Sequence, residues 1–298
     1  MKPAARALVG VSAVGVATLA YALWEARQYT LRRVTVPILP KGCPDVRLLH
    51  LTDLHLTPGQ PGKREWLRSL VELRPDAVIV TGDFLAHRDA VPVVMDALDA
   101  LLDIPGAYVL GSNDYFAPRG ANPLRYLTGP SAVDTRREQL PWPDLVAGLT
   151  AAGWQDLDNA SGRLDLGSVR LDLRGVDDPH INRDRYANVE GPVDSQADAT
   201  IGVAHAPYLR VLDAMAADGL DLIVAGHTHG GQVCLPGFGA LVTNCDLDRA
   251  RAKGLSRHPA RQGRSWLHVS AGVGTSPFAP VRLACPPEAT VLTLTASG

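Results

Sequence analysis

Side chains that could bind metal ions follow five apolar segments of this 298-residue chain. The first two segments end in Thr52-Asp53-Leu54-His55 and Thr81-Gly82-Asp83. The third ends in Gly111-Ser112-Asn113-Asp114, and two later ones end in Ala204-His205 and Gly226-His227-Thr228-His229. Unpaired polar groups beside a core are costly, and a metal cluster explains all of them together. The predicted metal ligands are Asp53, His55, Asp83, Asn113, His205, His227 and His229.

The types of these ligands indicate the chemistry. Imidazole and carboxylate groups without thiolates suit Mn²⁺, Fe or Zn²⁺. Seven ligands are too many for one ion that keeps an open position, and they fit two divalent ions bridged by one carboxylate. Two such ions would clamp a phosphoryl group, and a hydroxide bridging them would attack phosphorus in line. The sequence therefore predicts a dinuclear, metal-dependent phosphoric ester hydrolase.

The segments that carry the ligands predict an α/β fold. Short apolar runs alternate with helical stretches from residue 46 onward, which is typical of strands joined by helical crossovers. Ligands bound by such folds lie at the carboxyl ends of the strands, where the predicted metal ligands stand. Strands are expected at residues 46–52, 77–81, 107–110, 163–166, 169–174, 200–204, 221–225, 266–270 and 290–295. Helices are expected at residues 64–73, 90–102, 145–152 and 208–217.

The N-terminal segment differs in kind from the rest of the chain. Ala7–Trp24 contains no charged residue, and as a helix it would rise about 27 Å, close to the thickness of a bilayer core. Tyr21 and Trp24 stand where interfacial aromatic residues are expected. We therefore expect an uncleaved membrane anchor over residues 1–24, a linker over residues 25–45 and a catalytic domain over residues 46–298. A cleaved signal peptide is the alternative, although its apolar stretch is usually shorter.

An anchor of this kind predicts a single-pass protein of the cell membrane, with the membrane itself as a partner. Lys2 and Arg6 before the anchor favour an extracytoplasmic domain, whereas Arg27, Arg32 and Arg33 after it oppose that orientation. The orientation therefore stays open, and so does the oligomeric state. The formal net charge of −2 gives no reason to expect a nucleic-acid partner.

The four cysteines do not indicate a metal site of their own. None belongs to a CxxC pair, so a cysteine-based zinc site is not expected. Cys234 and Cys245 could form a disulfide if the domain is exported, and small buried thiols are the alternative.

The order of the motifs DLH, GDF, GSND, AHAP and GHTHGGQ resembles the calcineurin-like metallophosphoesterase superfamily over about residues 46–296. The resemblance implies a four-layer α/β/β/α sandwich. It also implies that Asp83 bridges two ions. One ion would be held by Asp53, His55 and His229, and the other by Asn113, His205 and His227.

The anchor, GHTHGGQ and the tail motif at residues 270–288 are similar to those of a narrower branch. That branch comprises bacterial membrane-associated phosphodiesterases, including enzymes similar to UDP-2,3-diacylglucosamine pyrophosphatase. This likeness favours a phosphodiester or pyrophosphate substrate, lipid-linked or nucleotide in nature, over a phosphomonoester.

One motif departs from the family pattern, which is Gly-Asn-His followed by Asp or Glu. In Gly111-Ser112-Asn113-Asp114, either Ser112 takes the place of the ligand or the turn shifts and Asn113 is the ligand. We favour Asn113, because an amide oxygen is a better metal ligand than a neutral hydroxyl. The usual histidine is missing either way, and asparagine cannot act as a general acid. The catalytic residues expected are Asp83, Asn113 and Asp114, with Asp114 as a candidate acid.

Two arginines are candidate substrate contacts. Arg119 lies in the long irregular segment after the third motif, and Arg282 lies in the tail motif. Both could approach a substrate phosphate, whereas a solvated loop and a structural salt bridge are the respective alternatives. The altered third motif also supports a second hypothesis for the whole chain, namely an inactive or metal-poor scaffold that binds proteins.

Overall fold

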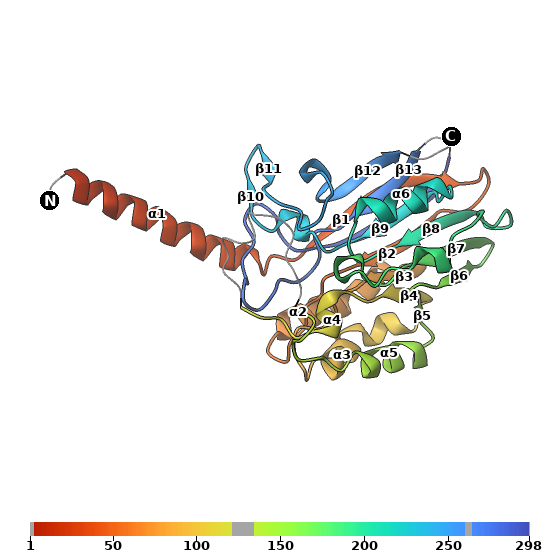
Figure 1. Ribbon diagram of the computed structural model, residues 1–298, viewed down its shortest axis with the longest axis horizontal. Helices are drawn as coiled ribbons and strands as arrows, with labels where there is room; N and C mark the ends of the chain where they lie inside the picture. The colour runs from red at the N-terminus through yellow and green to blue at the C-terminus, as the bar shows by residue number, and fades with distance from the viewer. Residues whose placement is uncertain (1–2, 121–133, 260–263, 298) are drawn as a thin grey trace.

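Two six-stranded mixed sheets form the centre of the protein (Figure 1). This computed structural model describes residues 3–120, 134–259 and 264–297, with side chains from residue 12 on, residue 264 excepted. In spatial order, the first sheet contains β1 (Thr30–Leu39), β14 (Glu288–Ala296), β2 (Val46–Leu51), β3 (Ala77–Thr81), β4 (Gly106–Val109) and β5 (Gln155–Asp156). The second contains β12 (Gly254–Pro259), β13 (Arg264–Val269), β9 (Leu222–Ala225), β8 (Ala199–Val203), β7 (Val169–Gly175) and β6 (Ser161–Leu166). A separate two-stranded ribbon contains β10 (Cys234–Leu235) and β11 (Gly239–Ala240).

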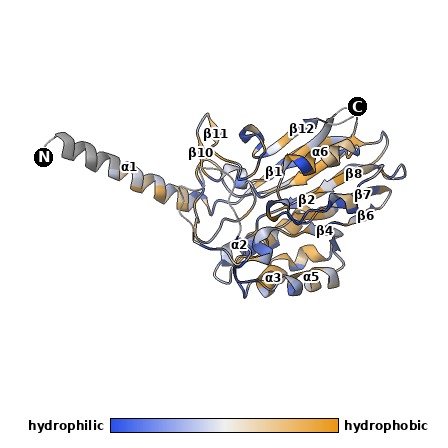
Figure 2. Cartoon of the chain, viewed as in Figure 1, coloured by the Kyte–Doolittle hydropathy of each residue, from blue (hydrophilic) through white to orange (hydrophobic). Residues whose placement is uncertain are grey.

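Alternating side chains of the strands build the cores on both faces of each sheet. On β2, Leu48 faces the other sheet, whereas Leu49 and Leu51 face the helices. Ile201 of β8 joins the core between the sheets. Figure 2 shows hydrophobic segments along the strands of both sheets.

Helices cover the two outer faces. The outer face of the first sheet packs against α2 (Pro61–Ser69), α3 (Val91–Leu102) and α5 (Trp142–Ala151). The outer face of the second packs against α6 (Leu209–Ala217), whose Met215 shares a core with Ile223 of β9. The layers are therefore helix, sheet, sheet and helix. The remaining short helices are α4 (Ser112–Tyr115), η1 (Leu70–Leu73), η3 (Pro179–Ile181), η4 (Tyr186–Asn188), η5 (His229–Gly231) and η6 (Arg249–Arg251).

The predicted α/β class with strands and helical crossovers is confirmed. Strand β3 has the bounds expected from the sequence, and most other predicted elements shift by one to three residues at an end. β2, β3 and β4 are adjacent and parallel, and so are β8 and β9. The carboxyl ends of the strands within each group therefore point the same way, which is the arrangement that the ligand motifs require.

The segment predicted as a linker over residues 25–45 differs from expectation. Most of it forms β1, which pairs in parallel with β14 at the edge of the first sheet. Arg32, Arg33 and Pro37 obscure this strand in the sequence, because charged residues and proline are common on edge strands. Val36 and Leu39 point inward and are fully buried.

The N-terminal helix α1 (Pro3–Glu25) extends away from the sheets in Figure 1. Its end is attached to the catalytic domain, since the Glu25 carboxylate accepts hydrogen bonds from the backbone N–H groups of Ala284 (3.0 Å) and Cys285 (2.7 Å). The predicted anchor overlaps this helix, although the side chains of residues 7–11 lie outside the described part. Among the residues described, no helix combines the length and hydropathy needed to cross a membrane.

Candidate metal centre

The loops that follow the strands carry the predicted ligands in an uncommon backbone conformation. Positive φ angles occur at Asp53 (50°), His55 (43°), Asp83 (57°), His227 (67°) and His229 (49°). The left-handed region costs a residue with a side chain on the order of 1–3 kcal/mol, and such strain concentrates at functional sites. Five of the seven predicted ligands are thus held in turns that local stability alone would not favour.

Glycines make room for the ligand side chains. A Cβ atom added to Gly111 would collide with Asp83 Oδ1, and one added to Gly226 would collide with Thr52 Oγ1 and lie 2.7 Å from Asp53 Oδ2. The chain therefore approaches both carboxylates more closely than any other residue type would permit.

The first group of ligand atoms is formed by Asp53, His55 and His229, as the family resemblance implied. The Nε2 atoms of His55 and His229 lie 3.3 Å apart. Asp53 Oδ1 lies 3.6 Å from His229 Nε2 and 4.0 Å from His55 Nε2. This carboxylate oxygen is buried without a hydrogen-bond partner among the described residues, which fits a bound cation.

The second group surrounds Asp83. Its Oδ2 atom lies 3.5 Å from His55 Nε2 and 3.5 Å from His205 Nε2, so one oxygen stands between the two groups. His227 Nδ1 lies 3.3 Å from His205 Nε2. The two adjacent clusters of aspartate and histidine are consistent with a dinuclear centre, and the Asp83 carboxylate lies between their imidazoles.

Hydrogen bonds to backbone carbonyls fix how the second group presents its imidazoles. His205 Nδ1 donates to Thr81 O at 2.7 Å, and His227 Nε2 donates to Asn244 O at 3.1 Å. A carbonyl can only accept, so these nitrogens carry hydrogen and the opposite ones face the centre. Metal-binding histidines are oriented in this way in many proteins.

Most of the imidazoles are held neutral, as metal ligands must be. Burial lowers the pKa of His55 to about 4 and lowers the pKa values of His227 and His229 well below the usual range. Burial raises the pKa of Asp83, but the adjoining imidazoles of His205 and His55 and hydrogen bonds from Asn113 outweigh it and lower the value. Asp83 is therefore ionised at neutral pH.

His205 is the exception. Burial lowers its pKa, but the carboxylates of Asp83, Asp178 and Asp53 and the Thr81 carbonyl outweigh this effect and raise the value to about 9. Without metal, a proton on this ring supplies positive charge between the carboxylates. The carboxylates thus need positive charge beside them, which bound metal ions would also supply.

A pH dependence of metal binding follows from the His205 pKa. Below about pH 9 the metal-free ring holds a proton that a metal ion must displace, so affinity rises with pH and levels off above that value. At pH 8, Mn²⁺ binding by the metal-stripped chain should release about one proton from this ring, and affinity should rise up to about tenfold per pH unit. Calorimetry in buffers of different ionisation enthalpy measures this release. Binding without release at pH 8 would contradict the assignment of His205.

The third motif places Asn113, and not Ser112, at the carboxylate of Asp83. The Asn113 backbone N–H donates to Asp83 Oδ1 at 2.8 Å, and its amide lies 2.7 Å from Asp83 Oδ2. As placed, the amide N–H group donates to this oxygen, and a flip would bring the amide oxygen against it, which requires a cation between the two oxygens. This geometry favours Asn113 as the ligand.

Asp114 is placed differently from a leaving-group acid. It is fully buried, and its oxygens accept hydrogen bonds from the backbone N–H groups of Asp83, Leu85 and Gly111 at 2.8–2.9 Å. The predicted acid therefore joins the two ligand loops that follow β3 and β4. Burial and the neighbouring Asp83 raise the pKa of Asp114 to about 7.

The two predicted substrate arginines occupy contrasting places. Arg119 is exposed and lies 3.9 Å from the carboxylate of Asp134. Arg282 is fully buried, and its guanidinium donates to backbone carbonyls within the protein. The accepting carbonyls belong to His229 (2.8 Å), Ala271 (2.7 Å), Gly272 (3.1 Å) and Gly274 (2.6 Å). Arg282 therefore links the loop that contains His229 to the segment at residues 271–274.

Two residues beside the centre had no assigned role in the sequence. Asp178 is fully buried, and one of its oxygens accepts from the His180 backbone N–H at 2.7 Å. The ring of His180 lies 4.4 Å from that of His227, centroid to centroid. In the sequence, the acidic pair Asp177-Asp178 before Pro179 is typical of a loop, so it does not indicate a place beside the centre.

The cysteine pair considered from the sequence is not formed. All four cysteines are free, and Cys234 and Cys245 belong to separate buried clusters. Cys234 Sγ instead donates to the Gly230 carbonyl at 3.2 Å.

The chain is similar to several proteins of known sequence or structure. A relative from Bacillus subtilis (strain 168), "Uncharacterized protein YpbG", is 26% identical over 295 residues, which cover 96% of this chain and 98% of the relative. The Bos taurus "Transmembrane protein with metallophosphoesterase domain" is 26% identical over 250 residues, covering 78% of this chain and 51% of that protein. Among solved structures, the chain is similar to the crystal structure of Phosphopantetheinyl Hydrolase (PptH) from Mycobacterium tuberculosis. The superposition covers 83% of this chain and 96% of that chain, with 13% sequence identity and a TM-score of 0.45. The family model "Calcineurin-like phosphoesterase" matches residues 46–231. Because this match spans more than half of the chain and contains all seven predicted ligands, the protein belongs to the calcineurin-like phosphoesterase family.

Proposed function

We propose that the protein hydrolyses a phosphodiester or pyrophosphate bond with two divalent metal ions, Mn, Fe or Zn. The observation that carries this proposal is the single oxygen of Asp83, which stands 3.5 Å from an imidazole of each ligand group. When bound, two ions would activate water and neutralise charge on the phosphoryl group. Retention of every ligand type argues against an inactive scaffold.

The residues of the chain keep this centre ready for catalysis. Asp53 and Asp83 supply negative charge, and Thr52 Oγ1 and the His227 backbone N–H fix Asp53 Oδ2 by donating at 2.9 Å each. Rigid turns in left-handed conformations hold the ligands before any ion arrives. A preorganised site of this kind loses little free energy to rearrangement during the reaction.

The third motif bears on the choice of substrate. Asn113 stands against Asp83 and cannot donate a proton as an acid. The oxygens of Asp114 are occupied by backbone N–H groups. A leaving group that departs as a stabilised anion, such as a phosphate, therefore suits this centre better than an alkoxide. This reasoning supports a pyrophosphate or activated diester substrate, lipid-linked or nucleotide in nature.

Attachment to a membrane belongs to the same proposal. The described part of α1 exposes large apolar side chains, among them Val16, Leu19 and Trp24. The Bos taurus relative is named a transmembrane protein. We infer from these features and the uncharged stretch of residues 7–24 that α1 associates with a lipid surface, as in membrane-associated phosphodiesterases.

A substrate panel tests the proposed reaction. The full chain, loaded with Mn²⁺, should cleave nucleotide or lipid-linked pyrophosphates at least about 10²-fold faster than alkyl phosphomonoesters, since the latter need a protonated leaving group. Mass spectrometry of the two phosphomonoester products measures pyrophosphate cleavage, and release of inorganic phosphate measures monoester cleavage. Equal or faster cleavage of alkyl monoesters would overturn the preference for diesters and pyrophosphates.

A further inference from the structure

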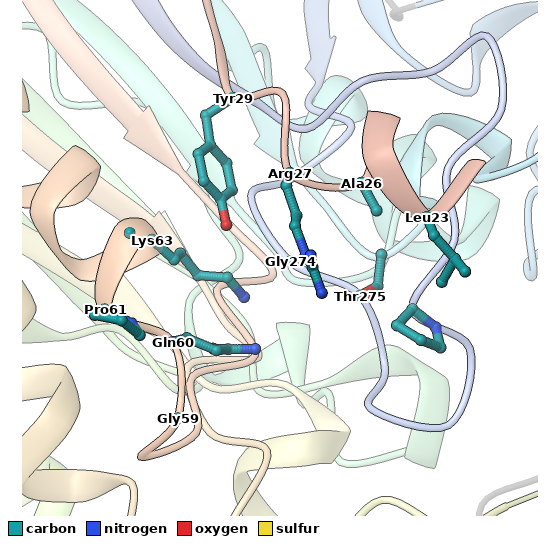
Figure 3. A pocket seen from close by; sticks show the side chains of 12 residues that line it. Leu23, Ala26, Arg27, Tyr29, Gly59, Gln60, Pro61, Lys63, Gly274 and Thr275 are labelled. Atoms are coloured by element: carbon teal, nitrogen blue, oxygen red, sulfur yellow. The ribbon is translucent and has the colours of Figure 1, made fainter. Parts of the chain in front are cut away.

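A cavity of about 580 Å³ lies between the end of α1, the start of α2 and the segment after β13. None of the seven metal ligands lines it. Figure 3 shows the side chains of Arg27, Tyr29, Gln60 and Lys63 directed toward its interior from different parts of the chain. Cavities of this size commonly hold small organic ligands.

The polar lining of the cavity is cationic. Arg27 and Lys63 are its two charged residues, and no carboxylate is present among the lining residues. Arg27 has no ion-pair partner among residues that the structure describes. Lys63 is only 5% exposed, and its ammonium donates to the carbonyls of Leu54 (2.8 Å) and His55 (3.4 Å). This buried side chain has carbonyl acceptors but no carboxylate in the lining, so an anion in the cavity would favour its charged form.

Further donors complete the lining. The Gln60 side-chain oxygen accepts from the Thr57 backbone N–H at 3.1 Å, which leaves its amide N–H groups for the cavity. The Tyr29 ring stacks on Trp66 with centroids 5.1 Å apart, and this contact holds its hydroxyl in place. Two cations with amide and hydroxyl donors are a set that recognises phosphate oxygens.

The cavity is separated from the metal centre by the turn at residues 53–55. The side chains of Asp53 and His55 belong to the ligand groups, whereas the carbonyls of Leu54 and His55 contact Lys63 on the cavity side. Gly274, which also lines the cavity, donates its backbone N–H to Asp53 O at 2.6 Å. A ligand in the cavity would therefore lie against the back of a metal-binding loop.

We propose that this cavity is a second binding site, which holds the phosphate ester group of an anionic ligand with Arg27 and Lys63 as counter-charges. Leu23 lines the cavity and lies on α1 at helical spacing from the exposed Val16 and Leu19. The apolar part of a phosphate-bearing amphiphile can thus continue along this helix. A lipid phosphate and a soluble phosphate ester share the same headgroup chemistry, and both are tested below.

Binding by the full, metal-loaded chain tests this site. The soluble probe is 3,4-dihydroxybutyl phosphonate, a non-hydrolysable analogue of glycerol phosphate, and the lipid probe is a phosphatidylcholine vesicle containing phosphatidic acid. R27Q should weaken binding of the soluble probe at this site at least about tenfold, and R27E more strongly, because a charge-assisted hydrogen bond is lost. R33Q is the matched control, since Arg33 is exposed, nearby in sequence and absent from the cavity lining.

The outcomes separate this site from the metal centre. Turnover of a small soluble diester should stay the same in R27Q, because Arg27 is not among the metal ligands. A loss of phosphonate affinity in R27Q but not in R33Q supports the site, and a parallel loss on phosphatidic acid vesicles identifies the lipid headgroup as a ligand. If R27Q and R33Q bind both probes as tightly as the unaltered chain, the proposal is wrong, whatever the metal centre hydrolyses.

Discussion

Replacing Asp83 by alanine is expected to lower turnover on the order of 10³-fold or more, because this carboxylate stands between both ligand groups. The variant also removes the partner of the Asn113 backbone N–H and amide, so the loop after β4 loses two of its hydrogen bonds to the centre. Steady-state kinetics at saturating Mn²⁺ measure the loss. Added metal should not restore the rate, since the bridge itself is missing.

Asp89 offers the control for this variant. It follows the same strand, and its carboxylate is 72% exposed and lies 3.6 Å from His87, outside both ligand groups. D89A should therefore keep near-normal turnover. A D83A variant that is folded and retains more than about a tenth of the activity would contradict the bridging role.

Replacing Arg282 by leucine is expected to lower the free energy of unfolding by about 3–5 kcal/mol. The guanidinium is fully buried and donates to the backbone carbonyl of His229 and to those of residues 271, 272 and 274. Leucine fills part of the volume but leaves those carbonyls without donors. Since one of them belongs to His229, the variant should also bind less metal at the first group. Chemical denaturation and metal analysis measure the two effects.

R282K and R136L give this prediction its controls. Lysine keeps the charge but cannot span the same carbonyls, so stability should recover only in part. Arg136 is 90% exposed, and R136L should change stability by less than about 0.5 kcal/mol. A stable R282L with normal metal content and a raised KM would instead support the direct substrate contact considered from the sequence.

The clustering of Asp53, His55, Asp83, His205 and His229 could be predicted from the sequence, because each of them follows a buried apolar strand. Parallel strands bring their carboxyl ends to one edge of the sheet, so the loops that carry Asp53 and Asp83 lie side by side. Thr52 and Thr81, at the start of these loops, are 29 positions apart in the sequence and share a hydrogen bond. His205 and His227 follow the adjacent parallel strands β8 and β9 for the same reason. Hydrophobic periodicity and the polar residues after the strands therefore predicted the fold class and the meeting of these side chains.

The roles of buried polar residues whose side chains bind backbone groups could not be predicted in the same way. Asp114 and Arg282 bind main-chain groups, and no local pattern indicates which loop a buried side chain will join. Asp178 comes near His205 because it follows β7, which pairs in parallel with β8, the strand before His205. Edge strand β1 was not predicted, because it pairs with β14, about 258 residues away in the sequence. Local sequence patterns contain no information about pairing at such a distance.

Metal content per chain is the measurement that tests the central claim most directly. The full chain should be purified with Mn²⁺, desalted and analysed by inductively coupled plasma mass spectrometry against the protein concentration from amino-acid analysis. The two ligand groups predict about two divalent ions per chain. A folded chain that retains no divalent ion under these conditions, or only one, would contradict the dinuclear centre.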